Sequence, residues 1–362
     1  DSKWIESKDK VCEVKYIKNN KLYLKNKDKI IDPLKHKLYI EFNNSETIYL
    51  ANDEEYDYFK YIVGNKNKLG KIKYDKNIIS IDENGTIKGI KDGETNLVIK
   101  YKNTKITSNI IVTNIITKRP SDGFDYNKDK LTCNKYSKEE NDLLDKILKT
   151  KIENVGYKTR AGVVEAARFL TLDFPYRINY FYENGRLTTN NVDGEGRYYH
   201  TGLYLNSSRF DNISYSIKSP QIWGCLLYSN PVKKEEYNGL DCSGFVSWAL
   251  LNGGFDVKDV GAGWSDKEDL TDFGEVKLIN DELIKSNSIK VGDLLHSERA
   301  GGHIGIIVGI DSDNYYVAQA IWYDTIGVII TKIKKEKLSS SFPHVVLMDK
   351  YYIEDGNLTN MW

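Results

Sequence analysis

The sequence is poor in residues that cross-link a chain and in stretches that could cross a membrane. It has four cysteines among 362 residues, and their spacing matches neither a disulfide framework nor a zinc site. No apolar run approaches the roughly 20 residues that a membrane-spanning helix needs. We therefore expect no membrane span, no metal and no cofactor.

The sequence also lacks an excess of charge of either sign. Its 52 Lys and Arg residues balance 52 Asp and Glu residues, so the formal net charge is zero. Proteins that bind nucleic acids or anionic membranes usually carry a basic surplus. We therefore expect neither nucleic acid nor an anionic membrane surface as a partner.

The chain is long enough for two or three domains, and its first third is rich in short β-patterns. Residues 1–36 alternate apolar and polar side chains, which predicts a β-rich N-terminal segment. Residues 37–115 contain several short strands with turns at Asn84-Gly85 and Asp92-Gly93. Strands and turns of this kind predict a β-sandwich.

Within this region, the strand and turn spacing of residues 77–112 resembles that of bacterial immunoglobulin-like domains of cell-surface proteins. The resemblance implies an all-β immunoglobulin-like domain over residues 37–115, which would serve in spacing or adhesion and could bind wall glycan or another wall polymer. The alternative is a purely structural module.

The remaining chain begins with a predicted linker and continues as one larger domain. Arg119-Pro120-Ser121-Asp122-Gly123 is typical of a connection and predicts a linker over residues 116–136. Residues 137–362 form the expected main domain. Ser137 with Glu140 makes a capping box for its first helix.

A second helix of this domain is predicted from Arg160 to Leu172, ending before Pro175 because proline disfavours helix at the residue preceding it. Residues 180–238 then form a long insertion rich in Tyr, Asn, Gly and Ser. Two interpretations remain open: an aromatic wall of a groove for sugar or peptide, or a subdomain that packs on itself.

The stretch from residue 239 to 254 carries the first candidate catalytic residue. Apolar residues follow Cys242 at helical spacing, and Gly253-Gly254 supplies a stop. Cys242 is thus expected in the first turn of a buried helix capped by Asp241. The helix N-terminus favours a thiolate, so we expect a pKa below the free value of about 8.5. The alternative is a small buried cysteine that only packs.

Downstream, a predicted hairpin supplies a histidine and an amide. His303 begins a strand over residues 301–310, and Gln319 lies on the next strand, over residues 315–320. A catalytic thiol needs a base, and the base needs a polar group that holds its ring. Cys242, His303 and Gln319 supply these three parts. His296 is expected on a neighbouring strand, outside this set.

Three motifs resemble the NlpC/p60 family of papain-like cysteine peptidases, which cut bacterial cell-wall peptides. They are Asp241-Cys242-Ser243-Gly244, Gly292-Asp293-Leu294 and His303-Ile304-Gly305-Ile306. The resemblance covers roughly the second half of the chain and implies an α+β papain-like fold. It places the family's nucleophile at Cys242, its base at His303 and its third residue, usually His, Asn or Gln, at Gln319.

The resemblance further implies that Asp241 and Ser243 border the substrate pocket. In the family a Pro-Tyr pair ends the helix that precedes the catalytic one, and its tyrosine helps to line the oxyanion site. Tyr176 is the best match for that tyrosine. A rival alignment uses residues 220–224 and places Gln221 there.

The function implied is that of a secreted or wall-associated peptidoglycan hydrolase. Its partner would be the stem peptide, cut between D-glutamate and a diamino acid; whether that is diaminopimelate or lysine stays open. The start at Asp1, without an initiator methionine, fits a removed signal peptide.

Two alternatives to this function remain. The first is another thiol reaction on the same fold, namely amide hydrolysis of another peptide, acyl transfer or transpeptidation. The second is a non-enzymatic surface adhesin, against which the intact set of Cys242, His303 and Gln319 argues.

Overall fold

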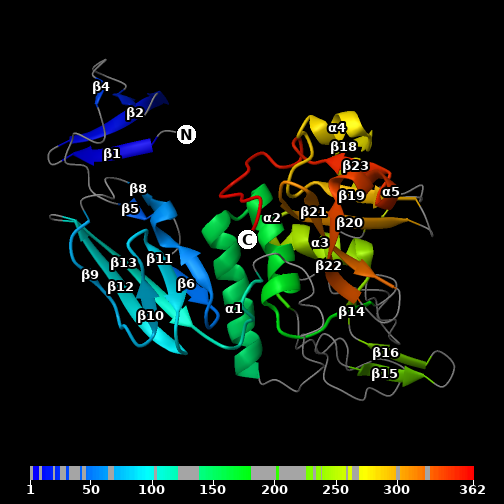
Figure 1. Cartoon of the computed structure of the whole chain (residues 1–362), viewed down its shortest axis with the longest axis horizontal. Coiled ribbons are helices and arrows are strands. Elements are labelled where there is room, and N and C mark those ends of the chain that lie inside the picture. Colours follow the sequence, from blue (N-terminus) through cyan, green and yellow to red (C-terminus); the bar gives the residue numbers. More distant parts are fainter. Residues whose placement is uncertain are drawn as a thin grey trace. The chain divides into compact units, whose positions relative to one another are not determined.

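The computed structural model divides the chain into two compact units, Asp1–Thr113 and Asn114–Trp362, and each has its own hydrophobic core (Figure 1). The described residues are 3–7, 10–18, 21–24, 30–31, 41–42, 46–63, 69–101, 104–120, 138–180, 201–203, 226–230, 234–237, 239–257, 260–262, 269–298, 302–322 and 327–362.

The N-terminal unit begins with a small antiparallel sheet. Its strands are β1 (Lys3–Ser7), β2 (Lys10–Lys18), β3 (Lys21–Leu24) and β4 (Ile30–Ile31). They pair in chain order, so the sheet is a meander. All four strands lie within residues 1–36, where the alternation of apolar residues predicts strands.

The rest of the N-terminal unit holds two larger sheets that share one core. One has the strand order β10-β11-β7 and the other the order β6-β13-β12-β9. Their strands are β6 (Thr47–Leu50), β7 (Glu55–Asp57), β9 (Ile72–Lys73), β10 (Ile79–Ile81), β11 (Thr86–Gly89), β12 (Gly93–Tyr101) and β13 (Thr104–Val112). A separate short pair joins β5 (Glu41–Phe42) to β8 (Ile62–Val63). Ile79 and Ile87 of the first sheet and Leu97, Ile99 and Ile110 of the second are buried in one cluster, so the two sheets face each other across that core.

The tight turn before β11 depends on a glycine. Gly85 has φ +85° and donates its N–H to the Asp82 carbonyl at 3.1 Å. A Cβ at this position would overlap the Phe59 ring. The turn predicted at Asn84-Gly85 is therefore confirmed, since a left-handed backbone beside a ring suits only glycine.

A six-stranded antiparallel sheet forms the centre of the C-terminal unit. Its order is β18-β23-β19-β20-β21-β22. The strands are β18 (Glu275–Leu278), β19 (Leu294–Ser297), β20 (His303–Ile310), β21 (Asn314–Ile321), β22 (Gly327–Lys334) and β23 (His344–Leu347). The turn at 311–314 makes β20 and β21 a hairpin, as the sequence predicts.

Five α-helices accompany this sheet in the described part of the unit. They are α1 (Lys138–Val155), α2 (Arg160–Arg168), α3 (Cys242–Asn252), α4 (Asp281–Lys285) and α5 (Leu338–Ser341). Helix α2 packs against both α1 and α3, and α3 lies against β20 and β21 (Figure 1). The helix predicted from Arg160 to Leu172 is α2 continued by a π-helical turn, Phe169–Asp173. Ser137, expected to cap α1, lies outside the described residues.

A buried ion pair joins α2 to the beginning of β19. Arg160 is fully buried, and its guanidinium donates to Asp293 Oδ1 at 2.7 Å. The Asp293 carboxylate also accepts from the backbone N–H of Met348 at 2.9 Å and of Lys290 at 2.8 Å. The aspartate of the Gly292-Asp293-Leu294 motif therefore holds α2, β19 and the segment after β23 together.

Residues 114–120, at the start of the C-terminal unit, pack against the end of α2. Arg119 donates to Asp173 Oδ1 at 2.7 Å and also forms an ion pair with Glu165. Ile116 is buried, and the Thr117 N–H donates to the Asp173 carbonyl at 2.8 Å. Residues 116–120 of the predicted linker thus make tertiary contacts. The sequence does not reveal these contacts, because the charge partners of Arg119 lie far away along the chain. Residues 121–136 lie outside the described residues.

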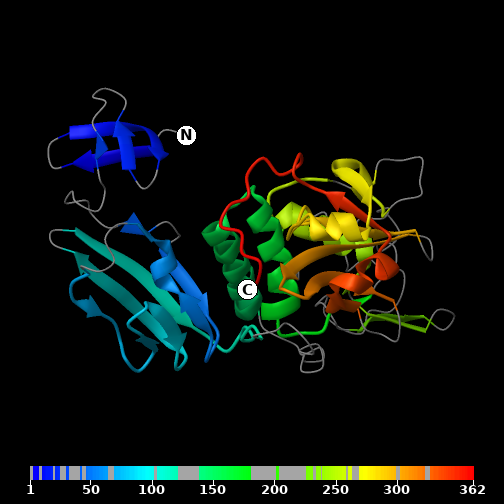
Figure 2. The same cartoon turned by 45° about the horizontal axis from the view of Figure 1, so that its top comes forward.

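The segment after β23 returns along α2 (red in Figure 2). The Glu354 and Asp355 carbonyls accept from the backbone N–H groups of Arg160 and Ala161, at 2.9 and 3.0 Å. Further on, the Trp362 indole donates to the Pro120 carbonyl at 2.6 Å. This segment therefore connects the first turn of α2 to residues 114–120.

Among the described residues, no helix is both long enough and apolar enough to cross a membrane. Of the insertion at 180–238, the structure describes Tyr180, residues 201–203, and two strands that pair as a hairpin, β15 (Leu226–Asn230) and β16 (Lys234–Tyr237). Most of the aromatic residues of this insertion lie outside the described part.

Candidate active site

Cys242 opens helix α3, as the sequence predicts. Asp241 is the N-cap residue, and its carboxylate accepts from the Gly244 N–H at 2.8 Å and from the Ser243 hydroxyl at 3.3 Å. Nearly every residue of α3 is buried, which is typical of a helix that is apolar on all sides. The predicted cap is confirmed, and Cys242 is 7% exposed at the start of a rigid helix.

A pair of two-residue strands fixes the chain just before the cysteine. β17 (Gly239–Leu240) runs parallel to β14 (Asn179–Tyr180). A Cβ at Gly239 would lie 1.8 Å from the Asn179 carbonyl oxygen, so this close approach requires glycine. The segment that follows Tyr176 is therefore held beside the start of helix α3.

His303 and Gln319 are joined by a hydrogen bond across the hairpin. His303 Nε2 lies 2.6 Å from Gln319 Oε1. Because an amide oxygen only accepts, Nε2 carries the proton and Nδ1 keeps its lone pair. The predicted placement of His303 beside Gln319 is thus confirmed, and their roles as base and orienting amide stay predictions.

Gly305 and Phe342 complete the surroundings of the imidazole. A Cβ at Gly305 would lie 2.8 Å from Val317 Cγ1 and 3.2 Å from the Gln319 Cβ, so the glycine allows β21 to pack closely beside it. The Phe342 ring stacks on the His303 ring with centroids 5.7 Å apart. Phe342 is buried and follows α5, so the ring is held by a residue distant in sequence. No pattern in the sequence identifies Phe342 as part of the site.

The Gln319 amide is also held at its nitrogen. Gln319 is 4% exposed, and its Nε2 donates to Thr331 Oγ1 on β22 at 2.8 Å. Thr331 is not among the site residues predicted from the sequence. Its only signal is a hydroxyl on a strand whose neighbouring positions are mostly apolar.

The sulfur of Cys242 lies against the strand that carries His303. The backbone N–H of Ile304 faces the sulfur and, with the N–H groups of Ser243 and of Cys242 itself, acts to lower the thiol pKa. Residues 242, 303 and 319, far apart along the chain, are thus brought together where α3 meets β20 and β21.

The thiol pKa differs from the sequence expectation. Burial first, and then the charge of Asp241, raises the pKa of Cys242 to about 12, which outweighs the backbone N–H groups around the sulfur. The expected low pKa is therefore wrong, because a helix N-terminus cannot compensate for removing a thiolate from water.

The imidazole is shifted in the complementary direction. Burial lowers the pKa of His303, the hydrogen bond that its Nε2 donates to Gln319 opposes that shift, and the charge of His296 adds to it. A raised thiol pKa and a lowered imidazole pKa each favour the neutral form of the group at neutral pH.

Tyr176 lies between the π-helical turn Phe169–Asp173 and strand β14. It is 9% exposed and packs edge-on against Phe174, with ring centroids 5.6 Å apart. Burial raises the pKa of Tyr176, and the charge of Glu140 on α1 adds to that effect. Its place in an oxyanion site stays a prediction, and residues 220–224 of the rival alignment lie outside the described part.

His296 is a strand residue near the site, as predicted, but belongs to a different set of contacts. It lies on β19 opposite Ile304, and its Nε2 is 2.6 Å from the Ala262 carbonyl. Its ring centroid is 6.2 Å from that of His344. In the described ranges, no three His, Cys, Asp or Glu side chains gather as metal ligands.

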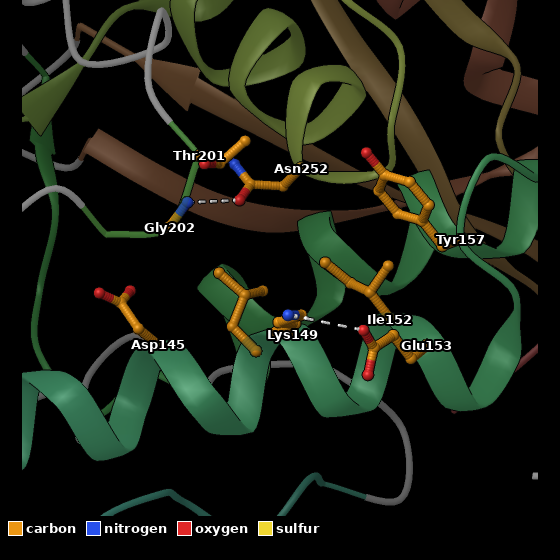
Figure 3. A pocket seen from close by; sticks show the side chains of 9 residues that line it. Asp145, Lys149, Ile152, Glu153, Tyr157, Thr201, Gly202 and Asn252 are labelled. Atoms are coloured by element: carbon orange, nitrogen blue, oxygen red, sulfur yellow. Dashed lines mark hydrogen bonds and ion pairs between the residues drawn. The ribbon is translucent and has the colours of Figure 1, made fainter. Parts of the chain in front are cut away.

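A pocket of about 530 Å³ lies at the other end of α3. Figure 3 shows Asn252 of α3 directed at the Gly202 amide, with Asp145, Lys149 and Glu153 of α1 across the pocket. Asn252 Oδ1 accepts from the Gly202 N–H at 2.8 Å, and Asp145 Oδ1 accepts from the Leu203 N–H at 2.6 Å. These bonds attach part of the long insertion to α1 and α3. Asn252 and Cys242 stand at opposite ends of α3, about 15 Å apart along the helix axis.

The three residues that the sequence analysis selects as catalytic are therefore found in one place, whereas the roles of Asp241, Ser243 and Tyr176 toward a substrate stay predictions. No family model, no curated protein and no solved structure matches this chain. The functional assignment consequently depends on the geometry of Cys242, His303 and Gln319.

Proposed function

We propose that the chain is a cysteine endopeptidase that cleaves peptidoglycan stem peptides, with an NlpC-type papain-like catalytic domain over residues 137–362. The observation that carries the proposal is the 2.6 Å contact between His303 Nε2 and Gln319 Oε1. It leaves Nδ1 as the basic atom of the ring, beside a cysteine that opens a buried helix. A cysteine at a helix start, packed against the strand of a histidine whose ring is held by an amide, supports covalent catalysis.

The reaction begins from the neutral pair. His303 Nδ1 accepts the thiol proton as the sulfur of Cys242 attacks the peptide carbonyl, because the thiolate is too costly to form beforehand in this buried site. The Cys242 N–H, in the first turn of α3, donates to the oxyanion, and the Tyr176 hydroxyl is proposed as a second donor. The imidazolium then gives its proton to the leaving amine. Water, deprotonated by His303, releases the acyl group from the sulfur.

The substrate class follows from the resemblance of the three motifs. It supports cleavage between D-glutamate and a diamino acid, with Asp241 and Ser243 bordering the pocket. The sandwich of β6 to β13 is proposed as an immunoglobulin-like module that spaces the catalytic domain or adheres to the wall, since its two sheets face each other across one core. Action on the wall places the protein outside the cell.

Digestion of purified muropeptides, followed by mass spectrometry, tests this function. We expect two products whose masses sum to the substrate plus one water, with the cut between D-glutamate and the diamino acid. Cys242→Ala should abolish them. Ser247→Ala is a matched control, because Ser247 lies on the same buried helix and its hydroxyl has no partner among the described residues.

Three other outcomes would each support an alternative function instead. A product that joins the acyl half to an added amine indicates transpeptidation or acyl transfer. Cleavage of a different amide bond indicates another amidase. Intact muropeptides, together with retention of the folded protein on purified walls, indicate a surface adhesin.

A further inference from the structure

The Gln319 amide is held at both ends, and only one end touches the histidine. Its oxygen accepts from His303 Nε2 at 2.6 Å and its nitrogen donates to Thr331 Oγ1 at 2.8 Å. The three side chains therefore form a row across β20, β21 and β22. Gln319 is 4% exposed, so water cannot readily replace a lost partner.

Strand register explains why Thr331 reaches this amide. In the antiparallel pair of β21 and β22, Val317 lies opposite Thr331 and Gln319 lies opposite Ile329. Residues two apart on a strand share a face, so Gln319 and Thr331 are diagonal neighbours on one face. The other inward positions of β22 on this face are Ile329 and Ile333, which offer no hydrogen-bond acceptor in their side chains.

Loss of the threonine hydroxyl would leave the amide nitrogen as a buried donor without its partner. Such a group is costly, and the amide can relieve the cost by rotating away or by exchanging its oxygen and nitrogen. Either movement takes the oxygen from His303 Nε2. An exchanged amide would present N–H to that ring nitrogen, which favours the tautomer with its proton on Nδ1. That tautomer cannot accept the proton of the Cys242 thiol.

We propose that Thr331 is a positioning residue that acts through Gln319 to keep the His303 proton on Nε2 and leave Nδ1 free for the thiol. The effect on peptide cleavage rests on the proposed function. The effect on the imidazole does not, because the tautomer exists whether or not a substrate is bound.

Two variants and one matched control separate a positioning role of Thr331 from an effect on the stability of the fold alone. Thr331→Val keeps the shape but removes the hydroxyl, and Thr331→Ser restores it. Thr171→Val removes another threonine hydroxyl of the same unit, which is buried and donates to the Ala167 carbonyl at 2.7 Å at the end of α2. Thr171→Val is expected to lower the free energy of unfolding without changing the tautomer of His303.

The first measurement is the ring-nitrogen NMR spectrum of the full chain labelled with ¹⁵N-histidine, since only five histidines contribute and His303→Gln assigns the signal. We expect wild type and Thr331→Ser to show His303 protonated on Nε2. Thr331→Val should show a mixture of tautomers. A wild-type signal protonated on Nδ1 overturns the proposal without any variant, so the test survives even if Thr331→Val fails to fold.

The second measurement is turnover of a muropeptide as a function of pH. Thr331→Val should lower kcat about tenfold with KM little changed, and Thr331→Ser should recover most of the rate. If Thr331→Val keeps both the wild-type tautomer and the wild-type kcat, Thr331 has no positioning role. If the tautomer shifts in Thr331→Val but wild type cleaves no muropeptide, the role of Thr331 stands and the proposed function fails.

Discussion

The C-terminal unit contains two kinds of buried polar network, and their difference separates structure from chemistry. Around Asp293, every described contact serves to hold elements together: Arg160 and the N–H groups of Met348 and Lys290 all donate to one carboxylate. Around His303, the hydrogen bond to Gln319 engages Nε2 and leaves Nδ1 as the basic atom of the ring. A network that collects its donors on one carboxylate stabilises the fold, whereas one that keeps a basic atom uncommitted can react.

Removing the base should give the largest effect on chemistry and little effect on stability. His303→Ala eliminates the acceptor of the thiol proton and the donor to the leaving amine, so muropeptide turnover should fall about a thousandfold or more. His296→Ala is the control, since His296 lies on the adjacent strand and bonds to the Ala262 carbonyl instead. If His296→Ala abolishes turnover while His303→Ala retains it, with both proteins folded, the base has been misassigned.

Removing the charge of Asp293 should have the opposite effect, namely a large loss of stability. Asp293→Asn leaves the buried Arg160 without its main charge partner, so the free energy of unfolding should fall by about 3 to 4 kcal/mol. Urea denaturation measures this loss. Asp281→Asn, at an exposed position on α4, should change stability by no more than about 0.5 kcal/mol. Full stability with lost turnover in Asp293→Asn would place Asp293 in the reaction.

The boundary of the catalytic unit offers a third test. A fragment that begins at Asn114 keeps Arg119 and its ion pairs with Glu165 and Asp173, whereas one that begins at Ser121 loses them. Lys151 remains near Asp173, at 3.4 Å, and compensates in part. The shorter fragment should therefore be about 2 to 3 kcal/mol less stable in urea. Equal stability of the two fragments would show that Arg119 contributes nothing to the fold.

Alkylation of Cys242 should give the smallest signal at neutral pH. Because burial raises the thiol pKa to about 12, little thiolate exists at pH 7. Labelling by iodoacetamide should then be slow and should rise about tenfold for each pH unit between pH 7 and pH 9. Peptide mapping of the labelled cysteine measures the rate. A rate that is already maximal below pH 7 would mean that the resting pair is thiolate and imidazolium.

The sequence predicts those features of the site that depend on residues close together in the chain. Helical spacing after Cys242 and strand alternation around His303 and Gln319 depend on neighbours a few residues away. The three residues proposed as nucleophile, base and orienting amide could therefore be selected without a structure. The cap at Asp241 and the turn at Gly85 are local in the same sense.

The remaining features depend on contacts between distant segments. The high thiol pKa arises from burial of Cys242 against β20, which helical spacing cannot reveal. The partner of Arg119 lies 54 residues away and that of Arg160 lies 133 residues away. Thr331 and Phe342 reach the site through strand register and a turn. Their amino-acid types alone carry no catalytic signal.

The attachment of residues 114–120 also has a mechanical consequence. If the N-terminal region were tethered while the catalytic unit was pulled, tension would enter this unit through these residues. The load would fall first on the bonds from Thr117 and Arg119 to the end of α2 and on the Trp362 contact with Pro120. Trp362 also packs edge-on against Tyr316 of β21, with ring centroids 5.5 Å apart. Tension on residues 114–120 would therefore reach the strand that carries Gln319.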